Sequence, residues 1–531
     1  MTEFDYVVIG GGAAGCVIAA GLAQDGRFSV VLIESGARDK SPWIHIPATF
    51  FKSMASRDVA AVVSEPEPSL DGNRFAVPQG RVLGGGSSVN GMIYMRGQKR
   101  DYDDWAEVHG CTGWAYQDVL PVFKSQEANT RLGDPFHGQS GPLMVADPIY
   151  KHPLGAAMIQ SAIATGLPAN EDFNGAQQEG AGWYQITAHK GRRKSAAVAF
   201  LRPALHLETL TVLTGHQAQR LKFKGRRAAG VEVIGPEGPK TILARKEIIL
   251  TAGSFQSPKL LMHSGIGPAH HLTALGIEVI HDAPEVGANY QDHVGAPVTM
   301  RLKHPIGVHG ADKGLKALRH GAEYALFRRG LLASNLLESG ACADTTGEGR
   351  PDVQYNFTPF APGPPGTPPL EVHAVSVNPM TMRPKSRGRL ALKDANPASD
   401  LHFTANPLDR IEDLDTLRRG IRLARDIFRQ NPLAELVTDE IWPGPDVSSI
   451  AGSNTLDPAI RKHARTIFHP SGTCRMGPGP ASVVDLNLRV NGVTGLRVAD
   501  CSVMPCLTSG NTNAPTMMIA GRAVGFILAD A

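Results

Sequence analysis

The sequence predicts an α/β protein whose first domain binds a dinucleotide, and two observations near its start carry that prediction. Residues 6–9 are apolar and have the pattern of a strand buried on both faces. Three glycines follow at once, and residues 13–24 have the composition of a helix. A second apolar stretch, residues 29–33, ends at Glu34. Strand, glycine turn, helix, strand and acid in this order are typical of a Rossmann-like unit.

Each glycine of the pattern Gly10-x-Gly12-x-x-Gly15 has a physical task in such a unit. Gly10 makes the tight turn, Gly12 lets the backbone approach a pyrophosphate, and Gly15 lets helix and strand pack closely. The helix start at Ala13 and Ala14 offers unpaired N–H donors to the same pyrophosphate. The Glu34 carboxylate can accept both hydroxyls of an adenosine ribose. At this point the dinucleotide can be NAD or FAD.

Bulk properties narrow the class of protein. A chain of 531 residues exceeds one ordinary core, so two or more domains are expected. With 42% hydrophobic residues the chain is globular, and a net charge of +3 is too small to favour nucleic acid or an anionic membrane as partner. No apolar run reaches transmembrane length, and the 19 histidines and 6 cysteines show no metal-ligand spacing. The start has no secretory signal pattern, so we expect a cytoplasmic protein with reduced thiols.

A second glycine-rich run, residues 80–91, lies between two apolar stretches. Its three successive glycines, two serines and one asparagine give a backbone that can lie flat against a planar ring with small donors beside it. Apolar residues 92–95 follow directly, which disfavours a surface linker. Further along, residues 353–357, 372–378 and 388–393 have strand patterns that predict an antiparallel sheet, and residues 408–429 predict an amphipathic helix.

Two long motifs resemble signatures of the glucose–methanol–choline family of FAD-dependent alcohol oxidoreductases. Residues 80–96 are similar to the first signature and residues 251–268 to the second, in order after the dinucleotide unit. The resemblance implies FAD as cofactor. It also implies an FAD-binding domain made of residues 1–100, 200–297 and 460–531. Residues 101–199 and 298–459 would form an α+β substrate domain built on an antiparallel sheet.

The resemblance also implies which residues contact FAD and which carry the chemistry. Besides the first glycine motif, the cofactor contacts would be Arg81, Gly85, Ser87, Asn90, Gly91, Ala218, Ala252, Gly253, Ala499, Asp500, Thr512 and Asn513. His469, held in a stiff loop before a proline, occupies the position of the family's active-site histidine, and imidazole can take a hydroxyl proton near neutral pH. Asn511 occupies the position filled by histidine or asparagine, and its amide can donate to the substrate oxygen but cannot act as a base.

Two positions depart from the family pattern. Val89 stands where several relatives carry a histidine bonded to the flavin, so FAD should be held by contacts alone. Gly295 stands where choline-specific oxidases carry a glutamate that faces the trimethylammonium group, and another carboxylate such as Glu338 would have to replace it. Asn378, Phe360 and Trp442 are candidates for the substrate pocket, although core packing is the commoner role for such residues.

The sequence therefore predicts oxidation of an alcohol, either a primary alcohol or a polyol or sugar, with His469 as base. The electrons would pass to a quinone-like or protein carrier. The alternative is an oxidase of aromatic or furanic primary alcohols that uses O₂ and releases H₂O₂. A flavin-binding protein without catalysis would be expected to lack His469 or Asn511, and both are present. A single dinucleotide motif followed by flavin signatures disfavours an NAD-dependent dehydrogenase.

Overall fold

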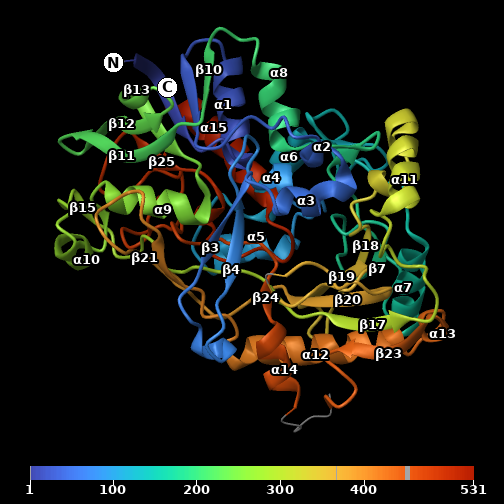
Figure 1. The fold of residues 1–531 in the computed structure, drawn as a ribbon. Helices are drawn as coiled ribbons and strands as arrows, with labels where there is room; N and C mark the ends of the chain where they lie inside the picture. Colours follow the sequence, from blue (N-terminus) through green and yellow to red (C-terminus); the bar gives the residue numbers. More distant parts are fainter. Residues whose placement is uncertain (1, 366, 449–454) are drawn as a thin grey trace.

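The computed structural model describes residues 2–365, 367–448 and 455–531, and the chain folds around two sheets (Figure 1). Residues 1, 366 and 449–454, which belong to the predicted domain ranges, lie outside the described residues. The mixed α/β architecture confirms the predicted fold class, including the second, antiparallel sheet.

The first sheet has seven strands in the order β10-β2-β1-β13-β12-β11, with β25 also paired to β13. These strands are β1 (Thr2–Ile9), β2 (Val30–Glu34), β10 (Leu210–Thr214), β11 (Gln217–Lys224), β12 (Arg227–Gly235), β13 (Gly238–Leu250) and β25 (Leu496–Val498). β10, β2, β1, β13 and β25 are parallel, whereas β11 and β12 are antiparallel neighbours. The carboxyl ends of β1, β13 and β25 therefore meet at one edge, where parallel sheets bind ligands.

Helices α1 (Ala13–Gln24) and α15 (Asn513–Ala529) pack against each other beside this sheet, although they come from opposite ends of the chain. The predicted helix at 13–24 matches α1 residue for residue, because the glycine turn fixes its start. α1 begins directly after the glycine turn that follows β1, and α15 begins after the loop that follows β25 and η5. The first residues of the two helices, Ala13 and Asn513, line one cavity.

The second sheet has eight strands in the order β23-β17-β20-β19-β18-β7, with β16 paired to β20 and β24 paired to β16. Its strands are β7 (Gly180–Trp183), β16 (Val294–Gly295), β17 (Val298–Leu302), β18 (Ser339–Ala343), β19 (Val353–Thr358), β20 (Ala374–Thr381), β23 (Val437–Trp442) and β24 (Arg465–Thr466). All pairings within it are antiparallel. The amphipathic helix α12 (Ile411–Phe428) packs on β20, and α7 (Pro153–Ala164) packs on β18.

One predicted strand belongs elsewhere. The stretch 388–393 forms β21 (Arg389–Leu392), which pairs with β22 (Leu401–Thr404) in a separate two-stranded sheet. The prediction that it joins the large antiparallel sheet is wrong, because the short hairpin connection pairs it locally. β21 packs instead on α9 (Gly253–His263), next to the first sheet.

The remaining elements form the connections around these layers. On the N-terminal side they are α2 (Pro42–His45), η1 (Pro47–Thr49), α3 (Phe50–Met54), β3 (Val59–Val63), η2 (Pro68–Leu70), β4 (Ala76–Gly80), α4 (Gly86–Val89), α5 (Lys99–Glu107), α6 (Tyr116–Gln126), β5 (Glu127–Asn129), β6 (Leu143–Val145), β8 (Ala188–His189), β9 (Arg192–Arg193), the π-helix η3 (Ala197–Leu201) and α8 (Arg202–Ala204). Later in the chain come β14 (Ile266–Gly267), α10 (Ala269–Ala274), β15 (His281–Asp282), α11 (Gly314–Phe327), η4 (Leu331–Ala333), α13 (Leu433–Leu436), α14 (Leu456–His463) and η5 (Cys501–Val503).

Candidate active site

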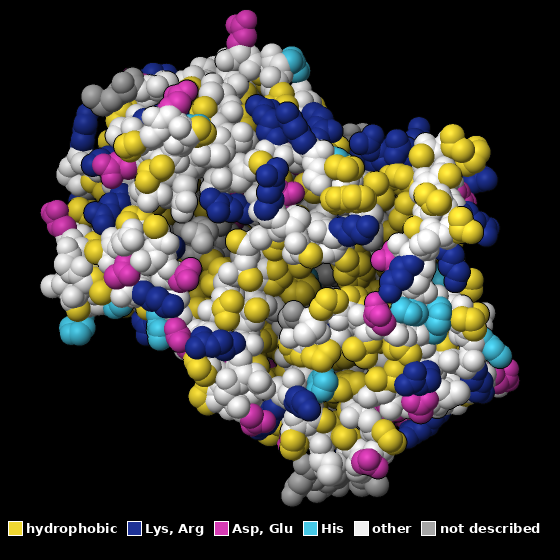
Figure 2. All heavy atoms as spheres, viewed as in Figure 1, with side chains coloured by type: hydrophobic (Ala, Val, Ile, Leu, Met, Phe, Trp, Pro, Cys, Tyr) yellow, Lys and Arg dark blue, Asp and Glu magenta, His cyan; other side chains and the backbone are white. Residues whose placement is uncertain are grey.

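A cavity of about 1600 Å³ runs between the two sheets, and its walls come from segments far apart in the chain. One wall holds the glycine turn after β1 and the turn after β13; the opposite wall holds Asn356 of β19 and Asn378 of β20. Figure 2 shows the molecule hollowed near its centre, with apolar side chains around the opening. A cavity of this size accommodates a dinucleotide together with a small substrate.

The glycine turn after β1 leaves no room for a side chain at Gly10 or at Gly15. Gly10 has φ +108°, and a Cβ there would lie 2.6 Å from the Thr251 carbonyl oxygen. A Cβ at Gly15 would lie 1.9 Å from the Gly10 carbonyl oxygen, because α1 packs directly on the turn. The same turn contacts the second glycine run, since a Cβ at Gly85 would lie 2.8 Å from the Gly12 Cα. The two glycine-rich segments therefore form one continuous surface.

Glu34 is fixed at the end of β2 with its carboxylate toward the cavity. One oxygen accepts the Gly11 N–H at 2.7 Å and the other accepts the Gly36 N–H at 2.7 Å. Burial raises the pKa of Glu34, and the two backbone donors oppose that effect. The first of these oxygens, Oε2, retains a lone pair and can still accept a hydroxyl donor, whereas Oε1 also accepts the Ser35 hydroxyl at 3.4 Å.

The second glycine run is held by a buried arginine that the sequence did not single out. The Arg193 guanidinium donates to the Asn90 side-chain oxygen at 2.6 Å and to the Asn90 carbonyl at 2.7 Å. It also donates to the carbonyls of Ser87 and Ile44. Burial without a carboxylate partner lowers the pKa of Arg193 to about 9. Its donors fix the segment by binding carbonyl and amide oxygens.

Asp500 joins the turn after β13 to the loop after β25. Its carboxylate accepts the Gly253 N–H at 2.8 Å, the Ser257 hydroxyl at 2.7 Å and the Ser502 N–H at 2.8 Å. Gly253 itself has open space where a Cβ would stand, so the backbone there faces the cavity bare.

His469 lies buried in the wall of the cavity, and Asp292 fixes its backbone. The Asp292 carboxylate accepts the His469 N–H at 2.8 Å and also the Thr466 hydroxyl. Burial raises the pKa of Asp292 to about 7, and these donors oppose that effect. The preceding residue, Phe468, has φ +70°, so the loop turns sharply before His469.

A chain of hydrogen bonds fixes the tautomer of His469. Nε2 of His293 lies 3.0 Å from the Met382 carbonyl oxygen, which only accepts, so this nitrogen carries a proton. Nδ1 of a neutral His293 is then an acceptor, and it lies 2.8 Å from Nδ1 of His469. His469 therefore donates through Nδ1 and keeps an unprotonated Nε2.

Both imidazoles are uncharged near neutral pH. Burial lowers the pKa of His293 to about 4. Burial, with the neighbouring His293, holds the pKa of His469 well below its ordinary value of 6.5. The Nε2 lone pair of His469 is thus available to take a proton without first losing one.

Asn511 stands beside that lone pair. Its side-chain nitrogen lies 3.1 Å from Nε2 of His469, and its oxygen accepts from the Gln354 amide at 3.3 Å. Asn511 is two residues before the start of α15, whose 17 residues direct the positive end of the helix dipole at the cavity. A base, a donor and a helix N-terminus converge here.

The structure brings nearly all of the sequence-predicted site residues to this one cavity. The lining includes Gly10, Gly12, Ala13, Ala14, Glu34, Arg81, Gly85, Ser87, Asn90, Gly91, Ala218, Ala252, Gly253, His469, Asp500, Asn511, Thr512 and Asn513. Gly15 and Ala499 lie behind the wall instead: Gly15 packs under the turn, and the Ala499 N–H donates to the Leu250 carbonyl at 2.9 Å.

The candidate substrate residues divide in the same way. Asn378 and Phe360 line the cavity, whereas Trp442 is buried in the core against His463. At Gly295 a Cβ would meet the Pro379 carbonyl and the Ile467 side chain, each at 2.8 Å. Glu338 is buried outside the lining, where it accepts from Ser334 and from the His152 N–H.

His293 and Asp292, like Arg193, are functional residues that sequence reasoning missed. They lie 176 and 177 positions before His469 in the chain, and no local sequence pattern indicates that the segment at 292–293 contacts the His469 loop. The antiparallel pairing of β16 with β24 brings them together. A histidine immediately before β16 was the only available signal.

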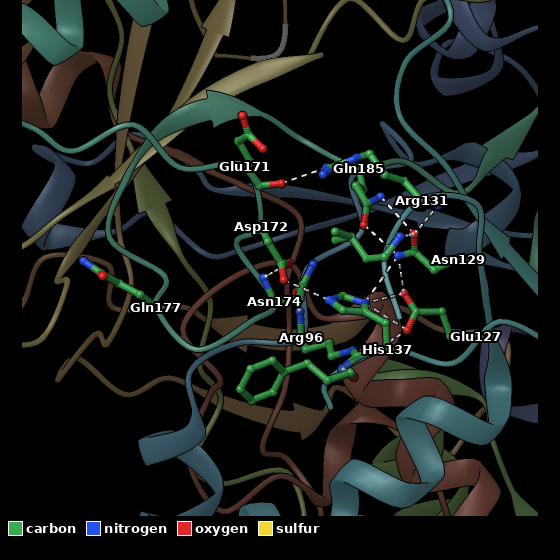
Figure 3. Close-up of polar contacts among 12 residues, drawn as sticks. Arg96, Glu127, Asn129, Arg131, His137, Glu171, Asp172, Asn174, Gln177 and Gln185 are labelled. Carbon is green, nitrogen blue, oxygen red and sulfur yellow. Dashed lines mark hydrogen bonds and ion pairs between the residues drawn. The ribbon is translucent and has the colours of Figure 1, made fainter. Parts of the chain in front are cut away.

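A second polar cluster, Arg96, Glu127, His137 and Asp172, lies outside the cavity lining (Figure 3). His137 has Nδ1 3.0 Å from Glu127 and Nε2 3.0 Å from Asp172, and Arg96 donates to Glu127. Burial works against charge on the imidazole, but the hydrogen bonds to Asp172 and Glu127 outweigh it and raise the pKa of His137. The Arg96 cluster is a structural ion network, in which Asn174 also accepts the Arg96 N–H at 2.8 Å.

Within the described ranges, every helix is too short or too polar to span a bilayer. Among the same residues no group of three or more His, Cys, Asp or Glu side chains is arranged to hold a metal ion.

Comparisons with known proteins agree with this geometry. Profiles described as GMC oxidoreductase match residues 4–295 and residues 384–520. The chain is 41% identical over 531 residues to an "oxygen-dependent choline dehydrogenase" from Brucella anthropi, a match that covers 99% of this chain and 96% of the relative. A protein of the same name from Rhizobium rhizogenes is 39% identical over 532 residues, with the same coverage of both chains.

Solved structures give the same result. The fold is similar to that of pyridoxine 4-oxidase from Mesorbium loti, with TM-score 0.89, 30% identity and 98% of each chain covered. It is also similar to a formate oxidase, with TM-score 0.90 and 25% identity over 100% of this chain and 98% of that one. The chain therefore belongs to the GMC (glucose–methanol–choline) oxidoreductases, enzymes that act on CH–OH donors.

Proposed function

We propose that this protein oxidises an uncharged alcohol to an aldehyde or ketone with a non-covalently held FAD, using His469 as the base. One observation carries the proposal: the unprotonated Nε2 of His469 and the Asn511 amide converge 3.1 Å apart on the cavity that also holds the glycine surface.

The residues present fit FAD. The fused surface of Gly12 and Gly85 has no side chains, and Gly86 and Gly253 face open space, so a flat cofactor can lie directly on the backbone. Oε2 of Glu34 remains able to accept a ribose hydroxyl. Val89 is buried against Ile44 and Val82 and offers no nucleophile, which supports binding without a covalent bond.

When bound, FAD supplies an acceptor for the hydride that leaves the alcohol carbon. His469 takes the hydroxyl proton at Nε2, because its Nδ1 already carries one. Asn511 donates to the substrate oxygen as negative charge develops there. The N-terminus of α15 stabilises negative charge on the same side of the cavity.

The pocket supports a neutral and polar substrate. Gly295 has no room for the carboxylate that would pair with a trimethylammonium group. Asn356 and Asn378 both line the cavity, and Asn378 donates to the Asn356 carbonyl at 2.8 Å. Polar amides in this wall favour a substrate with a further hydroxyl, such as a polyol or sugar.

The electron acceptor in this proposal is a quinone-like or protein carrier. The second candidate is an oxidase that reduces O₂ to H₂O₂ and acts on aromatic or furanic primary alcohols. The names of the structural relatives, pyridoxine 4-oxidase and formate oxidase, favour that candidate.

An alcohol screen with an artificial dye acceptor, run with and without O₂, tests the function. Dye reduction that depends on an alcohol supports it, and no reduction with any alcohol class contradicts it. Stopped-flow mixing of alcohol-reduced enzyme with air-saturated buffer then separates the two acceptors. Reoxidation as fast as turnover, with stoichiometric peroxide, would identify the oxidase.

A further inference from the structure

Helix α11 (Gly314–Phe327) exposes an apolar stripe instead of burying one. Leu315, Leu318, Ala322 and Leu326 follow one another at spacings of three, four and four residues, so they share one helix face. Leu315 is 84%, Leu326 74% and Leu318 69% exposed, the three highest values among large apolar side chains in the described residues. A soluble helix normally turns this face inward.

The opposite face holds the helix to the protein. Tyr324 is the one buried residue of α11, and its hydroxyl donates to the Gly191 carbonyl at 2.7 Å. The outward direction of the leucines is therefore set by an anchor and by packing against η4. In Figure 2 apolar side chains cover the outer side of the region where Figure 1 places α11.

Cations surround the stripe. Lys316, Arg319, Arg328 and Arg329 are exposed on or next to α11, and Lys190 and Arg192 are exposed on the loop that Tyr324 contacts. Three carboxylates lie nearby: Asp312, Glu323, which is 3.7 Å from Arg329, and Glu371, which pairs with Lys313 at 2.7 Å. The net charge of +3 is small, but this surface concentrates positive charge around apolar side chains.

We propose that this surface, the α11 stripe with its basic rim, docks on an anionic lipid membrane. An exposed apolar face flanked by Lys and Arg is the composition of helices that lie in the membrane interface. A second copy of the chain is a poorer occupant, because a two-fold contact would bring the two basic rims together. Docking on an anionic membrane buries the leucines among the acyl chains and places the cations beside the negatively charged headgroups.

The docking surface adjoins a wall of the cavity. Lys313 just before α11, His320 of α11, and Leu331 and Leu332 of η4 line the same cavity as His469. The inward side of α11 thus borders the cavity, and in this proposal its outward side contacts lipid. The docking surface is independent of the proposed function, since none of its residues contacts His469 or Asn511.

Vesicle sedimentation tests the docking with the full-length, flavin-loaded protein. Sucrose-loaded vesicles of phosphatidylcholine alone are compared with vesicles of three parts phosphatidylcholine to one part phosphatidylglycerol. Binding is expected on the anionic vesicles at about 0.1 M salt and should weaken markedly at about 0.5 M, because salt screens the cations.

The double variant Leu318→Ser with Leu326→Ser should lower the partition constant for the anionic vesicles about tenfold or more. Its flavin absorbance and melting temperature should stay those of the wild type. Ile411→Ser is the matched control, because Ile411 is also exposed (57%) but lies on α12. Binding that is absent on both vesicle types, or equal for wild type and double variant, overturns the proposal. A concentration-dependent dimer that the double variant abolishes, without vesicle binding, would assign the surface to a second copy.

Discussion

At the scale of single residues, the chemistry depends on which nitrogen of His469 is free. The Met382 carbonyl fixes the proton of His293, and His293 in turn fixes the proton of His469. The sequence does not indicate the contact between Met382 and His293 or the contact between His293 and His469. It shows His469 only as a histidine before a proline. The residue type could be predicted, but its tautomer required the packing of segments 176 positions apart.

His293→Ala removes the acceptor of the His469 Nδ1–H and admits water beside it. Flavin reduction should slow about ten- to a hundredfold, less than on loss of the base itself. In wild type the pKa of His469 lies well below 6.5, so the base is unprotonated at neutral pH and kcat/KM falls only as pH drops through that low value. In the variant, less burial raises the pKa, and the acid limb of the pH profile should move upward.

His293→Gln is the matched control, because its amide oxygen can accept the same hydrogen bond. It should restore most of the rate and the acid limb. A glutamine variant as impaired as the alanine variant would mean that the edge-to-face ring contact with His469, not the hydrogen bond, is what His293 provides.

The absence of a side chain at Gly295 predicts a preference for uncharged substrates over cationic ones. A cation buried near His469 would lack a carboxylate at this position, and burying an unpaired charge is costly. Choline should therefore have a kcat/KM at least about a hundredfold below that of the best uncharged alcohol. Steady-state assays with the dye acceptor measure this ratio, and efficient choline turnover would show that another group pairs with the cation.

At the scale of elements, local patterns predicted helices and strands well where turn chemistry fixes their ends. The glycine turn defines α1, and the predicted helix at 408–429 contains α12 (Ile411–Phe428). The prediction for 388–393 gave the correct strand but the wrong sheet. The sequence of a strand does not determine which other strand it pairs with, and here the partner is β22. The Arg96 cluster was likewise hidden, since its members come from four separate segments (Figure 3).

The Arg96 cluster predicts a pH-dependent stability. The folded pKa of His137 is raised above the ordinary 6.5, so its contribution is complete below 6.5 and is lost as pH rises through the raised value. His137→Ala leaves Glu127 and Asp172 with less compensation and should lower the free energy of unfolding by about 3 kcal/mol at about pH 6. The difference from wild type should shrink at higher pH.

Urea unfolding at about pH 6 and about pH 8.5 measures both effects. His206→Ala, at an exposed histidine, is the control and should change neither value. An equal loss at both pH values would show that His137 contributes by packing and not by its charge.

The segment 80–91 predicts how the cofactor is held. Arg193 fixes the backbone of this segment. The buried Val89 stands at the position where several relatives carry a histidine bonded to the flavin, and valine cannot form that bond. Purified protein should be yellow, and acid precipitation should release the flavin into the supernatant. A coloured pellet would reveal a covalent bond elsewhere.

At the scale of the whole molecule, the two sheets form different walls of one cavity. Glycines and helix N-termini lie at the edge of the first sheet, and the second sheet contributes Asn356 and Asn378 to the facing wall. The resemblance to the family predicted two sheets of these kinds, whereas the division of the chain into domain ranges stays a prediction. The outward stripe of α11 was not predictable, because an amphipathic pattern does not tell which face meets the protein.

The most direct test of the central claim is anaerobic stopped-flow reduction of the bound flavin by an alcohol, in wild type and in His469→Ala. The rate should fall by about two to four powers of ten while flavin content stays unchanged. Asn511→Ala should cost less, on the scale of one lost oxyanion donor. Near-wild-type reduction in His469→Ala would place the base elsewhere and contradict the role proposed for His469.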